Sequence, residues 1–240
     1  MEGIYRRLPD NEYNDITSRI LYEDNHLLVF NKRSGEIVQE DLTRDESLEQ
    51  KLKCYIAGRD SKPGAVFLGV THRLDRPVSG AVIFAKTSKA LERLNKSFRE
   101  GEIHKRYWAL VCSKPPKTED TLVDNIVRNE KRNKSYITSL PKGNSKEAKL
   151  KYTLIRTTDR YFLLEIELLT GRHHQIRAQL SHIGCPIKGD LKYGAPRSNP
   201  DGSISLHSRH ISLVHPVKKE RIEVVAPVLS DIFIKCVGAV

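Results

Sequence analysis

One carboxylate lies among cationic side chains in the segment 70–80, directly before the apolar run 81–85. Asp75 follows Arg73 by two residues and His72 by three. Flanking cations favour the ionised form of a carboxylate, which can then serve as a nucleophile or a general base. The same arrangement is also typical of a structural ion pair in which no chemistry takes place. This segment alone leaves a structural and a catalytic interpretation of Asp75 open.

A second polar segment, 171–177, coincides with the start of a predicted helix. Unpaired backbone N–H groups at a helix start favour anions, and cationic and amide side chains add further donors. The segment therefore predicts a receptor for a phosphate or a carboxylate. Arg177 lies beside the apolar stripe of this helix, and a half-buried arginine needs such an anion, for which Asp75 is a candidate. The other donors are Arg172, His174 and Gln175.

Two adjacent histidines, His173 and His174, allow two further interpretations. A metal site is disfavoured, because adjacent residues of a helix point about 100° apart and no nearby acid completes a ligand set. The other interpretation is an RNA hydrolase that uses the pair as acid and base. It agrees with the basic charge of the chain but gives Asp75 no special role.

The chain has 41 basic and 30 acidic residues and a formal net charge of +11. Such an excess points to an anionic partner, and nucleic acid is the first candidate. Residues 128–151 hold over half of it, because eight basic residues stand there against Glu130 and Glu147. The segment is either a solvated lysine-rich hairpin or a surface that contacts phosphates. Its first candidates for RNA contact are Lys131, Arg132 and Lys134.

Length and composition exclude several classes of protein. With 38% hydrophobic residues, a chain of 240 residues can bury one sizeable core, or one core plus a small appendage. The first residues lack the apolar stretch of a signal peptide, and no run approaches the roughly 20 apolar residues of a membrane span. We therefore expect a cytoplasmic protein without membrane contact. The scattered cysteines predict neither a zinc site nor a disulfide framework, and ordinary thiols are expected at Cys54, Cys112, Cys185 and Cys236.

Short apolar runs predict strands, and two amphipathic helices separate the early ones. The order is not a regular alternation of strand and helix, so we expect an α+β fold with a mixed, largely antiparallel central β-sheet flanked by helices and loops. No repeat or linker divides the chain, and residues 1–240 are expected to form a single domain. Helices are expected over 47–57, from Ser88 to Gly101 and from 171 to 184, and strands over 27–30, 66–70, 81–85, 107–111, 161–169 and 204–214.

Five collinear motifs resemble those of the RluA family of RNA pseudouridine synthases. Residues 71–75, Thr-His-Arg-Leu-Asp, with Ser79-Gly80 after them, resemble the family's H-R-L-D signature. Residues 105–111 are similar to its K-x-Y-x-A-L-V segment, and residues 169–177 to its L-x-T-G-R-x-H-Q-I-R segment. The remaining two motifs are 186–194 and 206–216, and in addition the upstream residues 31–35 are similar to the family's N-K-P-x-G strand end.

The resemblance implies an isomerase that converts uridine in RNA to pseudouridine and needs no cofactor. The reaction breaks the N-glycosidic bond, rotates the uracil and joins its C5 to the same ribose carbon. By resemblance, Asp75 is the nucleophile, attacking either the ribose or C6 of the base, and Arg177 keeps it ionised and aimed. Tyr107 then stacks on the flipped base and takes its C5 proton, unless it is an ordinary half-buried strand tyrosine. Leu206 packs against the base, and Arg73 fills the space left by the flipped nucleotide or contacts the RNA backbone.

The resemblance also implies the pseudouridine synthase catalytic fold, with a core from about residue 20 to 227 and the active site in a central cleft. Because few residues precede this core, we expect no separate N-terminal RNA-binding domain. The expected partner is a ribosomal or transfer RNA stem-loop, whose unpaired bases leave the stack at low cost, and His72 is a further candidate for RNA contact. The expected state is a monomer. Departures from the family pattern occur at Arg33, Val78 and Gln179, where proline, threonine and histidine are usual.

A catalytically silent protein is the main alternative to the enzyme. Such a protein would keep the scaffold for RNA binding or ribosome assembly. The presence of Asp75, Tyr107 and Arg177 at the matched positions favours the enzyme.

Overall fold

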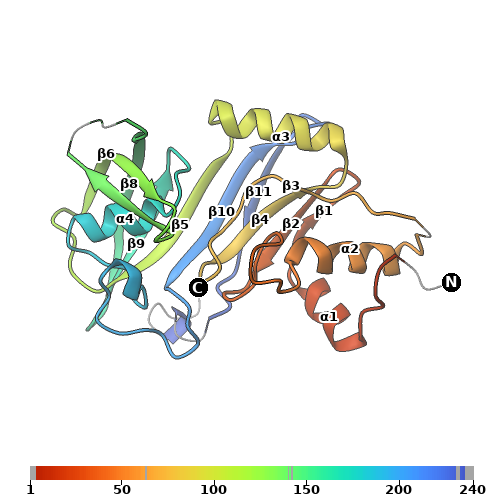
Figure 1. Ribbon diagram of the computed structural model, residues 1–240, viewed down its shortest axis with the longest axis horizontal. Helices are drawn as coiled ribbons and strands as arrows, with labels where there is room; N and C mark the ends of the chain where they lie inside the picture. Colours follow the sequence, from red (N-terminus) through yellow and green to blue (C-terminus); the bar gives the residue numbers. More distant parts are fainter. Residues whose placement is uncertain (1–3, 63, 140, 142, 231–232, 236–240) are drawn as a thin grey trace. The chain divides into compact units, whose positions relative to one another are not determined.

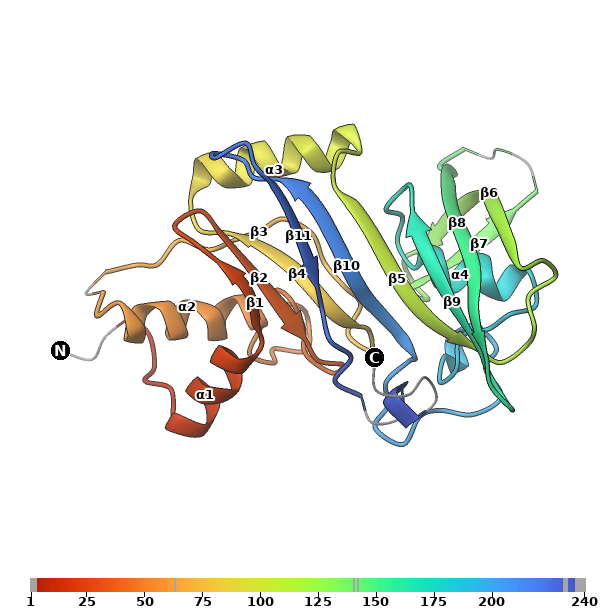
Figure 2. The ribbon, with the colours of Figure 1, turned by 180° about the vertical axis from the view of Figure 1, so that it is seen from behind.

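The computed structural model describes residues 4–62, 64–139, 141, 143–230 and 233–235. The chain divides into two compact units. The first unit comprises residues 1–103 and 212–226, and the second comprises residues 104–211 and 227–240. In Figures 1 and 2 the red to yellow elements belong to the first unit, and the green and cyan elements belong to the second.

The first unit contains an antiparallel sheet of β1 (Ile20–Glu23), β2 (Leu27–Lys32) and β4 (Ser79–Ala85), in that order. All six residues of β2 and the last six of β4 are buried, which explains why both strands contain uninterrupted apolar runs. The short β3 (Gly69–Val70) pairs with the end of β4. The loop between β3 and β4 carries Asp75.

Among its described residues, the first unit also contains the helices α1 (Asp10–Ser18), α2 (Leu48–Arg59) and α3 (Ser88–Glu100). α2 begins after Ser47, whose side chain accepts a hydrogen bond from the Gln50 amide at 3.2 Å. Thr87 caps α3 in the same way through the Ala90 amide, and α3 ends at Gly101 in the left-handed conformation, with a φ of 74°. α1 and α2 lie side by side (Figures 1 and 2).

The described residues of the second unit include a run of antiparallel strands in the order β5, β9, β8, β6 and β7. Their bounds are His104–Val111 for β5, Phe162–Leu168 for β9, Lys146–Thr157 for β8, Glu119–Asn129 for β6 and Lys134–Thr138 for β7.

One face of this sheet packs against α4 (Gln175–His182) and the short 3-10 helix η1 (Leu191–Tyr193). Ile126 of β6 and Ala148 of β8 form a buried cluster there with Ala178 and Tyr193. β10 (Leu206–Val214) follows and leads from the second unit into the first, where it pairs with β11 (Arg221–Val225). Directly paired residues of an antiparallel sheet have their side chains on the same face. The pairing therefore shows, for each strand of this sheet, which residues lie on the face that packs against α4.

The predicted α+β class with a largely antiparallel sheet is confirmed. β6, β7 and β8 were not predicted as strands, because polar and exposed residues interrupt them. The strand expected over 66–70 is shorter, and the helix expected from 171 begins only at Gln175, since His174 has a left-handed φ of 53°. A single domain over 1–240 with a core from about residue 20 to 227 stays a prediction.

Three of the cysteines predicted to be ordinary thiols are free, namely Cys54, Cys112 and Cys185. Cys236 and Lys142, the latter one of the basic residues of 128–151, lie outside the described residues. In the described part of the chain, every helix is too short or too polar to cross a membrane.

Candidate active site

The loop that carries Asp75 is fastened to β4 by two side chains. The Thr71 hydroxyl donates to the Ile83 carbonyl at 2.7 Å, and Nε2 of His72 accepts from the Ile83 amide at 3.1 Å. These side chains therefore continue the β3–β4 pairing beyond the last paired residue, Val70. The contact makes His72, predicted to bind RNA, a residue that positions the loop.

Residues 75–78 form a turn in which every backbone carbonyl group accepts a hydrogen bond. The Val78 amide donates to the Asp75 carbonyl at 3.0 Å and closes the turn. Lys32, at the end of β2, directs its ammonium into the turn and reaches the carbonyls of Asp75, Arg76 and Val78 at 3.3, 3.1 and 2.6 Å. The fourth carbonyl, that of Pro77, accepts from the Ser34 hydroxyl at 3.1 Å. We call this arrangement around residues 75–78 the lysine cradle.

The lysine cradle also uses the backbone after β2. The amide of Gly35 donates to the Arg76 carbonyl at 2.8 Å, and the Lys32 ammonium donates to the Arg33 carbonyl at 3.0 Å. Gly35 has a φ of 89°, a conformation that favours glycine. Residues 31–35, singled out in the sequence only as a strand end, therefore hold the loop of the predicted nucleophile.

Lys32 is fully buried. Burial lowers its pKa to about 8, against the opposing effect of the Glu36 and Asp75 carboxylates. The four carbonyl groups around the ammonium replace part of its lost hydration. The Asp75 side chain is partly exposed at the surface of the same turn, and Arg73 is exposed. A fixed backbone below a partly exposed carboxylate is suited to a nucleophile that must meet a substrate from outside.

In the second unit, Tyr107 and Arg177 lie on one side of the sheet. Tyr107 of β5 pairs with Ile166, which pairs with Tyr152, and Tyr152 shares its face with Ala148. Because Ala148 packs against α4, Tyr107 faces the α4 side as well. The Tyr107 side chain is buried, with 5% of its surface exposed.

Arg177 of α4 forms a buried ion pair with Asp190. Its Nε lies 2.7 Å from Oδ2 and its Nη2 lies 2.8 Å from Oδ1, so the contact is bidentate. The guanidinium carbon also lies 5.0 Å from the centre of the Tyr193 ring. The sequence predicted Asp75 as the partner of Arg177 and did not anticipate Asp190. The pairing of Asp75 with Arg177 stays a prediction, and Asp190 is a partner that the structure adds.

Lys105 is a site residue that the sequence motif contained but that received no role. It lies two residues before Tyr107 on β5, so the two side chains share a face. Its ammonium lies close to the backbone of Gly171, 3.9 Å from the position a Cβ would take there. Burial lowers the pKa of Lys105 to about 8.

The segment before α4 is fixed mainly by Gln175. Its Oε1 accepts from the Thr170 hydroxyl at 2.8 Å and from the Arg172 amide at 3.0 Å, and its Nε2 donates to the Lys149 carbonyl at 3.1 Å. Only 3% of Gln175 is exposed. Gln175 therefore positions this segment, and direct RNA contact by its amide stays a prediction. Arg172 is exposed, and its Nε donates to the Glu147 carbonyl at 2.8 Å.

The two histidines precede α4, so the helical geometry expected for them is wrong. Their rings stack with centroids 3.8 Å apart, because the left-handed φ of His174 turns the chain. Nδ1 of His174 lies 3.0 Å from the Tyr193 hydroxyl, and Nδ1 of His173 lies 2.8 Å from the Ser135 hydroxyl. In the described part of the chain, no group of three or more His, Cys, Asp or Glu residues is arranged to hold a metal ion.

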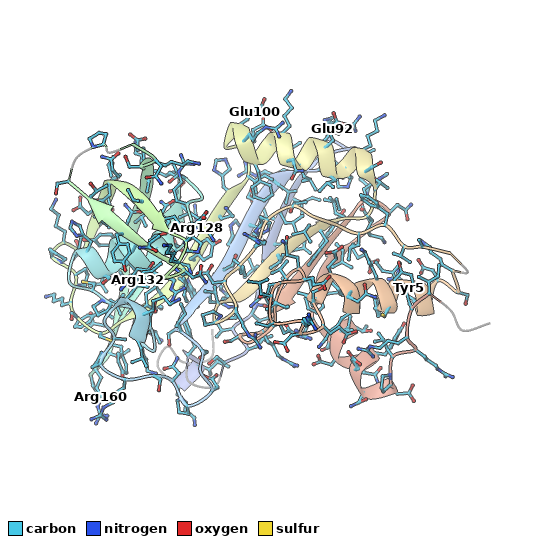
Figure 3. The ribbon with its side chains drawn as sticks, in the orientation of Figure 1. Tyr5, Glu92, Glu100, Arg128, Arg132 and Arg160 are labelled. Atoms are coloured by element: carbon cyan, nitrogen blue, oxygen red, sulfur yellow. The ribbon has the colours of Figure 1, made fainter. Side chains whose placement is uncertain are left out.

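The remaining predicted RNA contacts all lie in the second unit. Leu206 is buried at the start of β10, with 4% of its surface exposed. Lys131 and Arg132 are exposed in the β6–β7 turn, and Figure 3 shows Arg132 there. Lys134 is partly buried, with its ammonium 4.9 Å from the centre of the Tyr193 ring. RNA contact by these side chains stays a prediction.

Comparison with known proteins gives consistent matches. Residues 26–182 match the sequence profile of a family described as RNA pseudouridylate synthase. The ribosomal large subunit pseudouridine synthase D of Zymomonas mobilis is 31% identical over 231 residues, which cover 92% of this chain and 72% of that protein. An uncharacterized RNA pseudouridine synthase of Synechocystis sp. is 33% identical over 213 residues, which cover 87% of this chain and 64% of that protein. This chain thus spans less than two thirds of the Synechocystis protein.

A solved structure supports the fold. Human RNA pseudouridylate synthase domain containing 4 is similar with a TM-score of 0.77 at 24% identity, and the match covers 92% of each chain. At this level of identity the similarity concerns the fold.

Proposed function

The chain belongs to the RNA pseudouridylate synthase family, and we propose that it isomerises uridines of structured RNA to pseudouridine with Asp75 as the nucleophile. The observation that carries the role of Asp75 is the lysine cradle. The side chains of Lys32 and Ser34 donate hydrogen bonds to every carbonyl of residues 75–78. The side chain of Asp75 remains partly exposed. Such a turn can present a carboxylate to a base that has left its stack.

Tyr107 and Arg177 supply the second part of the proposed mechanism. Both face the α4 side of the second unit's sheet, and Tyr107 carries a hydroxyl that can accept or donate a proton near a stacked base. Arg177 is held in a fixed orientation by the bidentate contact with Asp190. We propose that its guanidinium acts on the Asp75 carboxylate as a positioning and charge-stabilising group. Whether Asp75 attacks the ribose or C6 of the uracil is left open by this proposal.

The RNA that we propose as substrate is ribosomal RNA. A relative named ribosomal large subunit pseudouridine synthase supports this choice, with transfer RNA as the second candidate. The net charge of +11 suits a polyanionic partner of either kind. We further propose a monomer that works in the cytoplasm on RNA stem-loops. Mapping pseudouridines in ribosomal and transfer RNA from cells with and without the gene would identify the target.

Release of tritium from RNA labelled at uracil C5 tests the reaction, because C5 loses its hydrogen when it joins the ribose. Wild-type protein is expected to release tritium, and Asp75→Asn to release none above background while it melts within a few degrees of wild type. Asp75→Asn keeps the backbone of the turn and the shape of the side chain, which makes it the matched test of the carboxylate. Activity that survives in this variant would refute the role of Asp75. A wild-type protein that binds RNA without releasing tritium would instead favour the silent scaffold.

A further inference from the structure

The second unit has a basic pocket that the proposed chemistry does not use. The pocket has a volume of about 530 Å³ and lies between the β6–β7–β8 part of the sheet and the segment before α4. Arg128, Lys146 and Arg172 line it, with Glu130 as the one carboxylate among its lining residues. We call it the hairpin pocket.

Strand pairing explains why two of these cations face the same space. Lys146 of β8 pairs with Ile126 of β6, and Arg128 lies two residues further along the same strand. Ile126 belongs to the buried cluster under α4, so Arg128 and Lys146 both lie on the α4 face. Lys149 and Lys151 are an odd number of residues away from Lys146 on β8 and therefore lie on the opposite face of the sheet. The basic segment 128–151 is thus divided between two faces of one sheet.

The cations of the hairpin pocket are not neutralised by neighbouring carboxylates. Among the described residues, neither Arg128, Lys146 nor Arg172 has a carboxylate oxygen within 4.0 Å of its charged nitrogen atoms. Like charges that share one pocket repel each other, and a bound anion removes that repulsion. Nε of Arg172 is bound to the Glu147 carbonyl, which fixes the guanidinium at the rim with its other donors available.

Hydrogen bonds hold two lining residues of the hairpin pocket, Ser135 and His173, in place. The Ser135 hydroxyl joins β7 to His173 through contacts of 2.8 Å to Nδ1 and 2.7 Å to the carbonyl oxygen. The Ser135 amide in turn donates to the Tyr193 hydroxyl at 2.8 Å. A pocket whose lining is already held in place loses little conformational entropy when a ligand enters.

One wall of the hairpin pocket adjoins the proposed catalytic residues of the second unit. Gly171 lines the pocket, and the Lys105 ammonium lies against its backbone. Lys105 shares its strand face with Tyr107. One lysine side chain and a strand step of two residues therefore connect the pocket wall at Gly171 to Tyr107.

We propose that the hairpin pocket binds a backbone phosphate of a nucleotide that flanks the target uridine. Arg128, Lys146 and Arg172 bind the phosphate oxygens, and Glu130 at the edge limits the charge that the pocket carries. This inference rests on the proposed function, because it identifies part of the RNA site of the same reaction. Contacts of this kind fix the register of the RNA and carry no base preference.

The test compares two pairs of substitutions with equal charge loss on the two faces of the sheet. Arg128→Gln/Lys146→Gln removes two cations of the hairpin pocket, and Lys149→Gln/Lys151→Gln removes two from the opposite face. The probe is ribosomal RNA purified from cells that lack the gene, and Kd is measured by filter binding at several KCl concentrations. The pocket pair is expected to weaken binding about tenfold and to reduce the slope of log Kd against log salt by about 1. The opposite-face pair is expected to change Kd by less than about twofold.

Tritium release from the same RNA adds a kinetic readout. The pocket pair is expected to raise KM with little change in kcat, because the phosphate contact is made before and during the reaction alike. Equal loss of affinity in both pairs, or no loss in the pocket pair, would overturn the proposal. If the pocket pair alone weakens binding but wild-type protein releases no tritium, the hairpin pocket is supported as an RNA site and the proposed function fails. Thermal melting checks the fold of all variants, and each is expected to melt within a few degrees of wild type because the substituted side chains are exposed.

Discussion

Arg177 makes a structural contact with Asp190 and has a proposed role toward Asp75, and substitution of both ion-pair partners separates the two roles. Arg177→Met removes the guanidinium and leaves the Asp190 carboxylate, 1% exposed, without the contacts at 2.7 and 2.8 Å. Arg177→Met/Asp190→Leu removes both charges and fills the space with apolar side chains. Asp190→Leu alone completes the cycle.

The magnitudes follow from the burial of the pair. Breaking a buried ion pair on one side costs about 3–5 kcal/mol, because an uncompensated charge stays in the interior. We expect the free energy of unfolding of Arg177→Met to fall by that amount. Replacing both partners by apolar residues of similar volume is often neutral or stabilising, so the double variant should recover to within about 1–2 kcal/mol of wild type.

Urea unfolding at neutral pH, followed by circular dichroism, measures these differences, and tritium release measures activity on the same samples. The double variant is expected to be folded and stable yet inactive, because the guanidinium proposed to act on Asp75 is absent. A double variant no more stable than Arg177→Met would refute the reasoning about the buried pair. A double variant that regains wild-type activity would refute a role of Arg177 beyond folding, and with it the predicted pairing with Asp75.

Two further predictions concern the backbone around the site. Lys32→Met should lower the free energy of unfolding by about 2 kcal/mol and lower kcat, because the carbonyls of the turn lose their ammonium while the cost of burying it disappears. Lys32 has a pKa of about 8 in the folded protein, against 10.5 for a solvent-exposed lysine. Between these two pH values the folded protein binds fewer protons than the unfolded chain. The free energy of unfolding of the wild type therefore increases as the pH rises through this range. Urea titrations at pH 7.5 and 9.5 should show a smaller gain in Lys32→Met, and an equal gain would contradict the lowered pKa of Lys32. Gly189→Ala should destabilise by more than about 2 kcal/mol, because φ is +90° and a Cβ would lie 2.6 Å from the Ser203 carbonyl oxygen. Gly58→Ala, inside α2 with open space around it, should instead stabilise the protein by about 0.5 kcal/mol. Thermal melting compares the two variants, and a Tm that shifts in the same direction in both would contradict this prediction.

Sequence patterns predicted those elements whose burial is uniform. Ala81 to Ala85 is apolar and buried throughout, and the helix from Ser88 has both its cap and its terminal glycine in the sequence. β8 was missed because Lys146, Lys149 and Lys151 interrupt its apolar positions, although Ala148 and Leu150 between them are buried. Period-2 alternation is present there, but a strong net charge obscured it.

The site was predictable in its residue types and less so in its contacts. The motif around Asp75 indicated a carboxylate with a role, and the turn that holds it was not foreseeable, because Lys32 and Asp75 are 43 residues apart and meet only in the folded sheet. Asp190 could not be chosen over Asp75 as the partner of Arg177, since one arginine can reach acids from several segments. The left-handed φ of His174 also carried no signal in the sequence, because the residue is not a glycine.

The lysine cradle has a consequence for how this loop can change during evolution or in the laboratory. The hydrogen bonds that hold residues 75–78 are accepted by backbone carbonyl oxygens, which every amino acid has. The exposed side chain of Arg76 can therefore vary without loosening the aspartate, whereas Val78, with 2% of its surface exposed, is also fixed by its burial. Such a loop separates reactivity from selectivity, so a library randomised at position 76 is a route to enzymes that modify other RNAs.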